Sequence, residues 1–344
     1  MEPAQSLSFI FRIGVRAMYV LAVDGGGTKT SAVISDELGN IHAKLVTNRS
    51  NPTAMEMELF EATLHQLLQG LRAQNPHIFS AVRICFAGMA GVQEKKAETI
   101  VETIFREYVH SEAIVIIQND ALIALYAGTF GGEGIVQIAG TGAVTVGYDH
   151  THSFYRVGGW GYLFDDEGSG YDLGVQALKA VFQSHDNRSM STLLTDALLK
   201  HFAVNNVPEL IDCIYGTKHP RTVIAPLSMY VMEAAELGDL AANIIRENSC
   251  SKLYHAIKTC YQQLSWKGQM VVPVVLMGGV LSNTSYFISK LTQLAINDQL
   301  PLQFLSPQLD PIGGAVIGAL HTMGISVGDE FSAKFMEHYV KWGK

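Results

Sequence analysis

Two glycine-rich turns, each lying between two short apolar segments, constrain the fold of this chain more than any other feature. The first turn lies in Asp24–Thr30 (DGGGTKT), between strands predicted over 19–24 and 31–35. The second is Gly140–Gly142 (GTG), between strands predicted over 134–139 and 143–148. Glycine supplies the positive φ angles that tight turns between paired strands need. Because the unit occurs once in each half, the sequence predicts an α/β fold made of two related domains.

The remaining apolar patterns alternate between helical and extended types. Residues 54–71 are predicted to form an amphipathic helix, because their large apolar side chains recur at spacings of three and four. Further helices are predicted over 93–108, 174–183, 189–202, 222–237 and 239–265, and further strands over 41–47, 82–87, 113–117, 271–277 and 302–305. A glycine cluster over 128–134 places the domain boundary near residue 130. We therefore expect an N-terminal domain over 18–130 and a C-terminal domain over 131–344, whose last helix can pack back on the N-terminal domain.

Composition excludes several classes of protein. Of the 344 residues, 48% are hydrophobic and 16% charged, which rules out a largely disordered chain. The net charge of −8 argues against a general nucleic-acid binder. Residues 1–17 contain no apolar run near the roughly 20 residues that span a bilayer, and we expect them to be an extension outside the fold. The four cysteines form no C-x-x-C pair, so we expect neither a structural metal nor a disulfide framework, and a cytoplasmic location.

The first turn has the composition of an anion site. The backbone N–H groups of Gly26, Gly27 and Thr28 can converge on a phosphate, and Lys29 either approaches that phosphate or is an exposed turn residue. Asp24 cannot contact a bare phosphate favourably, but its carboxylate can hold a hydrated Mg²⁺ that accompanies one. The spacing fits neither a Walker A loop nor a dinucleotide-binding fingerprint. The alternative to an anion site is a plain hairpin turn without a ligand.

The second turn favours the phosphate interpretation, because two such turns suggest two phosphate clamps that face each other across a cleft. Gly140, Thr141 and Gly142 would form the second clamp, with the Thr141 hydroxyl facing the phosphate. Gly278 and Gly279 follow another apolar strand and could supply a loop facing the base or ribose. Ligands of open α/β sheets bind beyond the carboxyl ends of the strands, where all three sites are predicted.

Two acids and a tryptophan are the other candidates for chemistry. Asp120 directly follows an apolar strand, where its carboxylate can accept a proton from a hydroxyl nucleophile; the alternative is a helix N-cap. Trp160 lies between Gly159 and Gly161 without apolar periodicity, which favours a ligand-covering or mobile loop over a core position. Asp166 is either a hydroxyl ligand or part of a solvated acidic loop.

These segments together resemble the actin/Hsp70/hexokinase ATPase superfamily. The resemblance rests on DGGGTKT, on IAGTG over 138–142, on the glycine pair 278–279 and on PIGGAVIGA over 311–319. Residues 158–170 (GGWGYLFDDEGSG) are more specifically similar to the N-acetylglucosamine kinase branch of the BadF/BadG/BcrA/BcrD ATPases. The resemblance covers nearly the whole chain from residue 19 to about residue 324.

The resemblance implies two ribonuclease-H-like (actin-like ATPase) domains with ATP and Mg²⁺ in an interdomain cleft, and phosphoryl transfer to a sugar hydroxyl. Asp120 matches the family's catalytic acid/base and a sugar ligand, and Asn51 matches a sugar-binding asparagine. By the same matching, Gly159, Trp160, Gly161 and Asp166 are sugar-binding, and Gly27, Thr28 and Thr141 contact phosphate. The chain departs from the family at Ala143 and Val144, where the animal enzymes have polar sugar contacts, and at Asp165, which replaces a usual glycine.

Three classes of function therefore compete. The first is an ATP-dependent kinase of an amino sugar, with N-acetylglucosamine ahead of glucosamine and N-acetylmuramic acid, and with a possible homodimer as in the family. The second is an ATPase activator of a dehydratase or reductase, which would hold an iron–sulfur cluster through cysteines whose sequence contexts are missing here. The third is a nucleotide-switched binder of the chaperone or actin type, which would need a client domain or filament surfaces. We expect no nucleic-acid or membrane partner.

Overall fold

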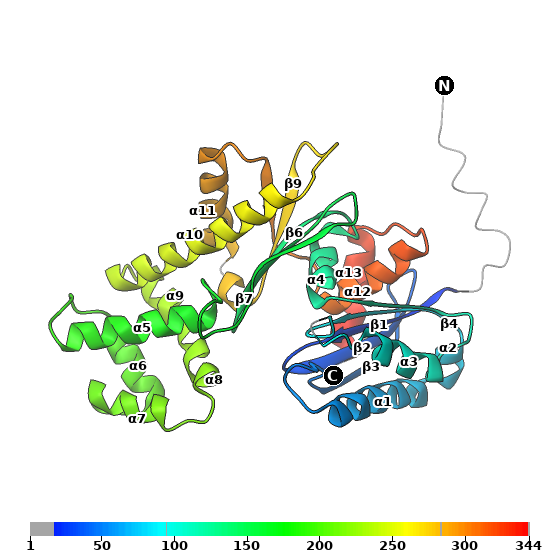
Figure 1. Cartoon of the computed structure of the whole chain (residues 1–344), viewed down its shortest axis with the longest axis horizontal. Helices are drawn as coiled ribbons and strands as arrows, with labels where there is room; N and C mark the ends of the chain where they lie inside the picture. Colours follow the sequence, from blue (N-terminus) through cyan, green and yellow to red (C-terminus); the bar gives the residue numbers. More distant parts are fainter. Residues whose placement is uncertain (1–16, 94, 283, 343–344) are drawn as a thin grey trace. The chain divides into compact units, whose positions relative to one another are not determined.

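The computed structural model describes residues 17–93, 95–282 and 284–342, so nearly all of the expected extension 1–17 lies outside the described residues. The chain divides into two compact units (Figure 1). Unit 1 comprises residues up to Gly131 together with Gln308–Lys344, and unit 2 comprises Gly132–Pro307. The first boundary lies next to residue 130. Residues 308–344, which were expected in the C-terminal domain, belong to unit 1, so more of the chain than its last helix returns to the first unit.

Unit 1 is built on a mixed five-stranded sheet in the order β3-β2-β1-β4-β5. Strands β1, β2 and β3 are antiparallel neighbours, whereas β4 and β5 continue the sheet from β1 in parallel. The strands are β1 (Tyr19–Gly25), β2 (Lys29–Asp36), β3 (Ile41–Asn48), β4 (Val82–Met89) and β5 (Ile114–Gln118). Its helices are α1 (Met57–Gln74), α2 (Pro76–Ser80), α3 (Glu98–Tyr108), α4 (Asp120–Thr129), α12 (Pro311–Thr322) and α13 (Asp329–Lys341).

Unit 2 repeats this topology. Its sheet has the order β8-β7-β6-β9-β10, with an antiparallel half and a parallel half as in unit 1. The strands are β6 (Gly134–Ala139), β7 (Ala143–Tyr148), β8 (Phe154–Gly158), β9 (Val272–Met277) and β10 (Leu302–Leu305). The two-unit α/β fold class predicted from the repeated turns is therefore confirmed, although β8 was absent from the sequence prediction.

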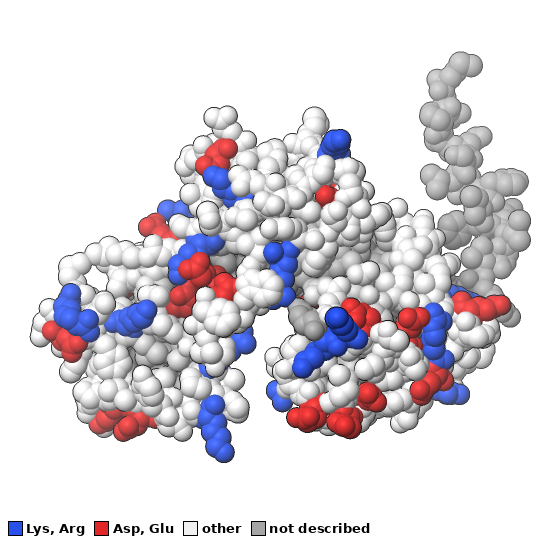
Figure 2. Space-filling model, in the orientation of Figure 1, with Lys and Arg blue, Asp and Glu red and all other residues white. Residues whose placement is uncertain are grey.

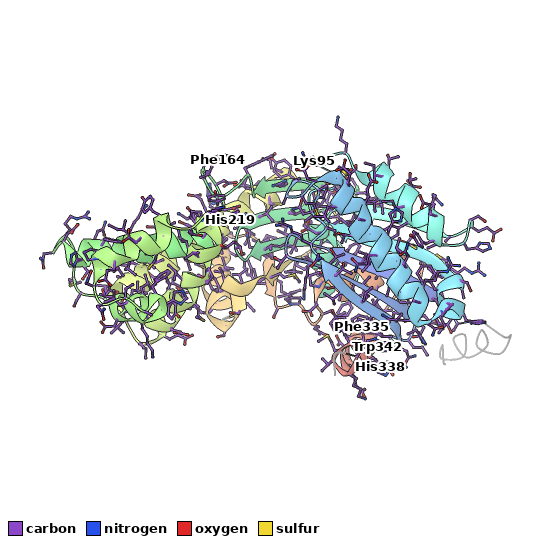
Figure 3. The ribbon with its side chains drawn as sticks, turned by 90° about the horizontal axis from the view of Figure 1, so that it is seen from below. Lys95, Phe164, His219, Phe335, His338 and Trp342 are labelled. Atoms are coloured by element: carbon purple, nitrogen blue, oxygen red, sulfur yellow. The ribbon has the colours of Figure 1, made fainter. Side chains whose placement is uncertain are left out.

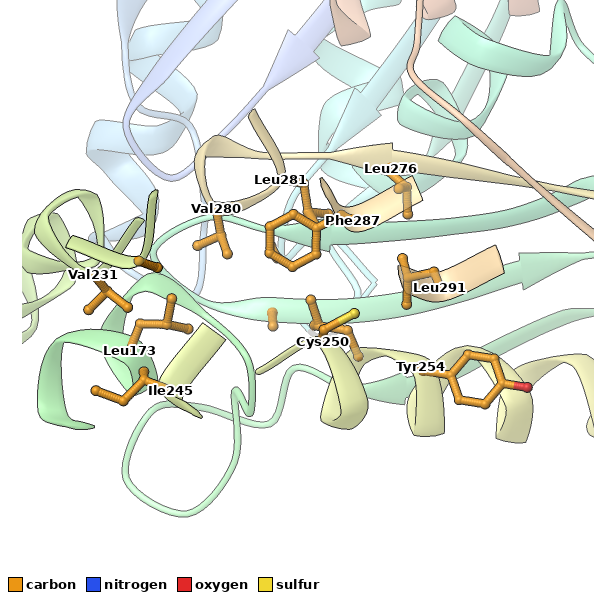
Figure 4. Packing of buried hydrophobic residues seen from close by; sticks show 14 of the residues in the cluster. Leu173, Val231, Ile245, Cys250, Tyr254, Leu276, Val280, Leu281, Phe287 and Leu291 are labelled. Atoms are coloured by element: carbon orange, nitrogen blue, oxygen red, sulfur yellow. The ribbon is translucent and has the colours of Figure 1, made fainter. Parts of the chain in front are cut away.

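The helices of unit 2 form a large apolar core with one face of this sheet. Figure 4 shows side chains from α5, α9, α10, β9 and α11 meeting in it, among them Leu173, Ile245 and Phe287. The helices are α5 (Gly170–His185), α6 (Leu194–Phe202), α7 (Leu210–Tyr215), α8 (Pro220–Ile224), α9 (Ser228–Glu236), α10 (Leu240–Gln263) and α11 (Thr284–Asn297), with short 3₁₀ turns η2 (Val207–Glu209), η3 (Ala225–Leu227) and η4 (Gly279–Ser282). The helix expected over 222–237 is interrupted by η3, which contains Pro226, because proline lacks an N–H and does not fit a helix interior.

Alternation along β1 gives the unit 1 sheet two different faces. Leu21 and Val23 point into a core with α1 and α3, whereas Ala22 and Asp24 belong to the opposite face. Helices α4 and α12 lie side by side (Figure 1), and their small residues make this possible. A β-carbon added at Gly314 of α12 would overlap the main-chain oxygen of Ile123 in α4, and one at Gly318 would lie 2.8 Å from the ring of Phe86 on β4. Asp24 therefore lies on the α4/α12 side of the sheet.

We expect Gly314→Ala to lower the free energy of unfolding by roughly 1–3 kcal/mol, the usual cost of forcing extra atoms into a packed site. The added methyl must push α12 away from α4, which also separates the first turns of these two helices. Thermal unfolding of the variant measures the effect. Gly328→Ala is the matched control, because a β-carbon there would meet no described atom within 4 Å. Equal melting temperatures for the two variants would contradict this account of the packing.

On the face shown in Figure 2, lysine and arginine alternate with aspartate and glutamate, and no stretch of one sign dominates. None of the helices in the described part of the chain combines the length and the apolar composition of a membrane span.

Candidate active site

The candidate residues fall into two groups, one in each unit. In unit 1, the turn between β1 and β2 is held by its neighbours, and its tip stays accessible. The N–H of Gly26 donates to the carbonyl of Lys29 at 3.0 Å, and the carbonyls of Gly25 and Gly26 accept from Ala90 and Ser50. Gly27 and Thr28 are exposed, and a β-carbon at Gly27 would meet no described atom within 4 Å. A ligand can therefore approach the amides of Gly27 and Thr28 directly.

Asn51 is fixed next to this turn. The hydroxyl of Thr30 donates to Ser50 Oγ at 2.7 Å, and Ser50 is fully buried. The Asn51 Oδ1 atom accepts from both the N–H and the hydroxyl of Thr53, at 2.9 and 2.7 Å. A β-carbon at Gly91 would overlap Asn51 Oδ1, so a glycine is needed there. These contacts orient the Asn51 amide and leave its Nδ2 group without a hydrogen-bond acceptor among the described residues.

Three carboxylates gather on the α4/α12 side of the unit 1 sheet. Asp24 lies near the end of β1, Asp120 is the first residue of α4, and Asp310 precedes α12. The close packing of α4 on α12 brings the first turns of both helices to the end of β1. Asp310 was not a candidate from the sequence, where it resembles an ordinary N-cap before Pro311. In the structure its side chain makes no capping hydrogen bond.

The electrostatic consequence is concentrated on Asp24. Burial, followed by the charge of Asp120, raises the pKa of Asp24 from its ordinary value of 3.8 to about 7. Asp310 raises this pKa further, and Lys29 lowers it. In this environment the negative charge of the Asp24 carboxylate is unfavourable. Either a bound proton or a nearby cation, such as a metal ion, would stabilise the group.

The structure removes the capping alternative for Asp120. The N-cap of α4 is Asn119, whose side chain accepts from the N–H of Ala121 at 2.8 Å. Asp120 is the next residue, in the first turn and partly exposed. Its carboxylate is therefore not required to cap the N-terminus of α4.

In unit 2, the turn between β6 and β7 is anchored by the start of α5. The N–H of Gly140 donates to the carbonyl of Gly142 at 2.9 Å. The carbonyls of Gly140 and Thr141 accept from the N–H groups of Gly170 and Tyr171, at 2.7 and 3.4 Å. The N–H groups at a helix start lack intrahelical partners, so this turn satisfies two of them. As with Gly26 in unit 1, a glycine N–H is used within the turn.

The two glycines after β9 have different environments. A β-carbon at Gly278, whose φ is 107°, would overlap the carbonyl of Ala139, so this glycine permits a close approach to β6. At Gly279 an added β-carbon would meet no described atom within 4 Å. Gly279 is thus the more accessible of the two to a ligand.

The loop between β8 and α5 exposes large apolar side chains. Trp160 is 65% exposed and Phe164 is 79% exposed; Figure 3 labels Phe164 on this loop. Asp165 Oδ2 accepts from the N–H of Trp160 at 2.8 Å, and Arg156 places its guanidinium 4.7 Å from the indole centre. Asp165, which departs from the family pattern, thus has a role in holding the loop.

Ala143 and Val144, the other departures, line a small pocket. Trp160, Asp165 and His255 also line it, and its volume is about 190 Å³. Unlike the polar side chains that the family pattern places at 143 and 144, these two residues present only apolar side-chain surface to it.

Asp166 is buried, with 4% of its side chain exposed, and it adopts a left-handed backbone with φ of 60°. Its Oδ1 atom accepts from the N–H of Ala143 at 3.4 Å, and its Oδ2 atom accepts from Arg221 Nη2 at 3.2 Å. Burial raises the pKa of Asp166, and the Ala143 N–H and Arg221 oppose this rise. Arg221 gave no signal in the sequence, where it is one arginine in a short polar segment.

Comparison with known proteins identifies the family. A sequence profile of the BadF/BadG/BcrA/BcrD ATPase family matches residues 21–319. The N-acetylmuramic acid/N-acetylglucosamine kinase of Clostridium acetobutylicum is 31% identical over 300 residues, covering 87% of this chain and 97% of the relative. The N-acetyl-D-glucosamine kinase of Dictyostelium discoideum is 29% identical over 312 residues, covering 88% and 98%.

The fold is shared with a solved structure. A solved structure from Porphyromonas gingivalis, provisionally assigned as an N-acetylglucosamine kinase, has a TM-score of 0.67 at 20% sequence identity. The match covers 90% of this chain and 100% of that one. The chain therefore shares its fold of two mixed sheets with that structure. The chain belongs to the BadF/BadG/BcrA/BcrD ATPase family, in which it is similar to the N-acetylglucosamine kinases.

Proposed function

We propose that this protein is an ATP-dependent kinase that phosphorylates a hydroxyl of an amino sugar, with N-acetylglucosamine as the preferred acceptor and its 6-phosphate as the product. The observation that carries the proposal is the group Asp24, Asp120 and Asp310 in unit 1. It combines one carboxyl of strongly raised pKa with a partly exposed carboxylate that is not needed as a cap. N-Acetylmuramic acid and glucosamine are the alternative acceptors, the former because a relative that phosphorylates it is 31% identical.

Asp120 is the general base in this proposal. A sugar hydroxyl is a weak nucleophile, and a carboxylate within hydrogen-bond reach orients it and accepts its proton as the new P–O bond forms. The bond between the terminal phosphorus of ATP and its bridging oxygen breaks, and ADP leaves. Phosphoryl transfer requires mainly positioning and charge neutralisation, so one base and a set of phosphate-binding groups suffice.

The backbone of both glycine turns supplies phosphate contacts. In unit 1 the N–H of Gly26 is already used, so the amides of Gly27 and Thr28 are the proposed ligands, with Lys29 as a nearby cation. In unit 2 the N–H of Gly140 is likewise used, which leaves the amides of Thr141 and Gly142 and the Thr141 hydroxyl. Gly279 is the proposed contact to the nucleoside side.

The residues present fit a magnesium ion held through water. Among the described residues, no three His, Cys, Asp or Glu side chains are placed to ligate one metal ion directly. Mg²⁺ usually keeps several waters and is held by one or two carboxylates together with substrate phosphates. Asp24 would hold it, with Asp310 beside it, and the ion would supply charge neutralisation on the phosphates.

The acceptor sugar contacts Asn51, Asp120 and the Gly159–Gly161 loop in this proposal. The Nδ2 group of Asn51 is oriented by the contacts of its Oδ1 atom, so it can donate to a sugar hydroxyl. Arg156 lies over the indole ring of Trp160. The Trp160 side chain is largely exposed, so a face of its indole can stack on a sugar ring.

The proposal is tested by coupled measurement of ADP release with a panel of acceptors. We expect N-acetylglucosamine to give the highest kcat/KM, followed by N-acetylmuramic acid or glucosamine, and glucose to be much poorer. Phosphorus NMR of the product identifies the hydroxyl that is phosphorylated. Sugar-independent ATP hydrolysis with no acceptor preference would contradict the kinase assignment.

The alternative of a dehydratase or reductase activator is disfavoured by the thiols. Of the four cysteines, Cys85, Cys250 and Cys260 are buried, and burial raises the pKa of each to about 12, which leaves Cys213 as one half-buried thiol. A cluster ligand must be an accessible thiolate. We expect the purified protein to be colourless and to contain no stoichiometric iron or zinc, which absorption spectroscopy and elemental analysis measure.

We expect acceptor binding to change the tryptophan fluorescence, and Trp160→Phe to abolish most of that change. The reason is that Trp160 is largely exposed, whereas Trp266 stacks on Tyr261 and donates its indole N–H to the carbonyl of that residue. Titration of N-acetylglucosamine into both proteins is the measurement, with Trp266→Phe as the control. A sugar-dependent signal that survives in Trp160→Phe would assign the reporter elsewhere.

A further inference from the structure

Arg221 lies against the glycine turn of unit 2, outside the motifs on which the family resemblance rests. A β-carbon built on Gly142 would lie 2.6 Å from Arg221 Nη2 and 2.8 Å from Asp166 Oδ2. The guanidinium and the carboxylate therefore adjoin the backbone of Gly142. This is the turn whose amides are proposed above to contact phosphate.

Two glycines on α5 allow the segment with Arg221 to approach. A β-carbon at Gly174 would overlap the carbonyl of Ile224, and one at Gly170 would lie 3.0 Å from the carbonyl of Ala225. The backbone at the end of α8 and the start of η3 thus rests directly on the first two turns of α5. Since the start of α5 also binds the carbonyls of the β6–β7 turn, one helix fixes both the turn and the segment that carries Arg221.

In the Asp166–Arg221 pair, the arginine is the exposed partner. Asp166 is 4% exposed, and each of its oxygens accepts a hydrogen bond from the protein. Arg221 is 38% exposed, and its guanidinium carbon lies 5.4 Å from the ring centre of Tyr162. A ligand therefore reaches Arg221 more readily than Asp166, which acts as an anchor for it.

Most hydrogen-bond donors of the Arg221 guanidinium are not used within the described part of the protein. The guanidinium carries five N–H groups, and the hydrogen bond to Asp166 uses one of them. Its Nε atom is buried without an acceptor among the described residues. Guanidinium groups bind phosphoryl oxygens in planar, two-pronged geometry, and such charge-assisted bonds are stronger than those between neutral groups.

We propose that Arg221, anchored by Asp166 and Tyr162, binds the terminal phosphoryl group of ATP above the Gly140–Gly142 turn. In the transfer step this group carries charge on three equatorial oxygens, so a fixed cation at the turn stabilises it as it leaves ADP. The inference rests on the kinase function proposed above and gives Asp166 a role in positioning Arg221.

The test compares ATP with ADP, which differ by the group in question. Binding of each nucleotide with Mg²⁺ is measured by calorimetry in the wild-type protein and in Arg221→Gln, Arg221→Lys and Arg188→Gln. Arg188 pairs with Asp186 on the surface of the same unit, so it is a matched control for the loss of one arginine. The melting temperature of each variant confirms that it is folded.

We expect Arg221→Gln to weaken ATP binding by about 10-fold or more while ADP binding changes by less than about 2-fold, because a charge-assisted bond to the terminal phosphate is lost. Arg221→Lys should lie between, since it keeps the charge and loses the fork. With the best acceptor, kcat should fall at least as much in Arg221→Gln, with little change in KM for the sugar. Arg188→Gln should match the wild type in all of these measurements.

Equal losses of ATP and ADP affinity, or no loss of either, would overturn the proposal. Inhibition by the sugar 6-phosphate shows whether Arg221 binds the phosphate of the product instead of that of ATP. If this inhibition weakens in Arg221→Gln while the preference for ATP over ADP is unchanged, Arg221 binds the product and the assignment to ATP is wrong. The nucleotide comparison needs no acceptor sugar. Failure of the acceptor panel would therefore remove the kinase function without deciding this test.

Discussion

Asp120→Asn is expected to lower kcat with the best acceptor sugar by about 100-fold or more, the usual scale for loss of a general base. Asparagine keeps the shape of the side chain and can still hydrogen-bond the hydroxyl, but it cannot accept the proton. ATP binding should stay within a few fold, and raising the Mg²⁺ concentration should not restore turnover. Steady-state kinetics at saturating sugar and nucleotide, with calorimetric ATP binding, measure both quantities.

Asp196→Asn is the matched control for this variant. Asp196 is also an acid in the first turn of a helix, α6, and it is exposed. An effect that comes only from losing a negative charge at a helix N-terminus would appear in both variants, at about 0.3–1 kcal/mol of stability each. If Asp120→Asn kept most of its turnover and lost ATP binding instead, the assignment of Asp120 as the base would be wrong.

Asp24→Asn is expected to stabilise the ligand-free protein at pH 8 while impairing its use of Mg²⁺ and ATP. The pKa of Asp24 is raised from 3.8 to about 7, so the folded state holds a proton that the unfolded state has lost between these pH values. The protonated Asp24 side chain therefore makes its full contribution to the free energy of unfolding below about pH 4. This contribution is lost as the pH rises to about 7. This shift in the pKa of Asp24 corresponds to a free-energy cost of roughly 4 kcal/mol for the charged form relative to the protonated form in the folded protein.

Removing the charge removes this cost. We expect the melting temperature of Asp24→Asn at pH 8 to exceed that of the wild type by about 2 °C or more, and the gain to shrink at pH 5. KM for ATP should rise, with partial rescue by excess Mg²⁺, because the carboxylate that holds the hydrated ion is gone. Scanning calorimetry at both pH values, followed by kinetics against Mg²⁺, separates the two effects.

Asp36→Asn provides a control of opposite sign. Burial alone would raise the pKa of Asp36, but hydrogen bonds from Asn40, His42 and the N–H of Leu38 outweigh it and lower this pKa. Its contribution to stability is present at high pH and is lost as the pH falls, so Asp36→Asn should lower the melting temperature at pH 8. A lower melting temperature for Asp24→Asn at pH 8 would contradict the buried-charge account.

The C-terminal segment shows why the domain limits were harder to predict than the fold class. Helix α12 consists of small and apolar residues, and this composition fits packing on either domain. Only the match of Gly314 and Gly318 to the surfaces of α4 and β4 selects unit 1. Local sequence patterns carry no information about a partner that lies almost 200 residues earlier in the chain.

The sequence alone determined the local features of the fold, which depend on residues that are neighbours in the chain. The two glycine turns, the strands beside them and the acids at strand ends follow from local spacing, and their repetition predicts the repeated sheet topology that the structure has. The tertiary structure alone decided which acids share a site and which side chains face a ligand. Asp310 joins Asp24 and Asp120 only because α12 packs on α4, and Asn119 takes the cap that Asp120 could have filled. Arg221 reaches the second turn only because Gly170 and Gly174 let its segment rest on α5. Burial and proximity come from packing between distant segments, so the pKa of Asp24 and the exposure of Arg221 could not be predicted from the order of residues.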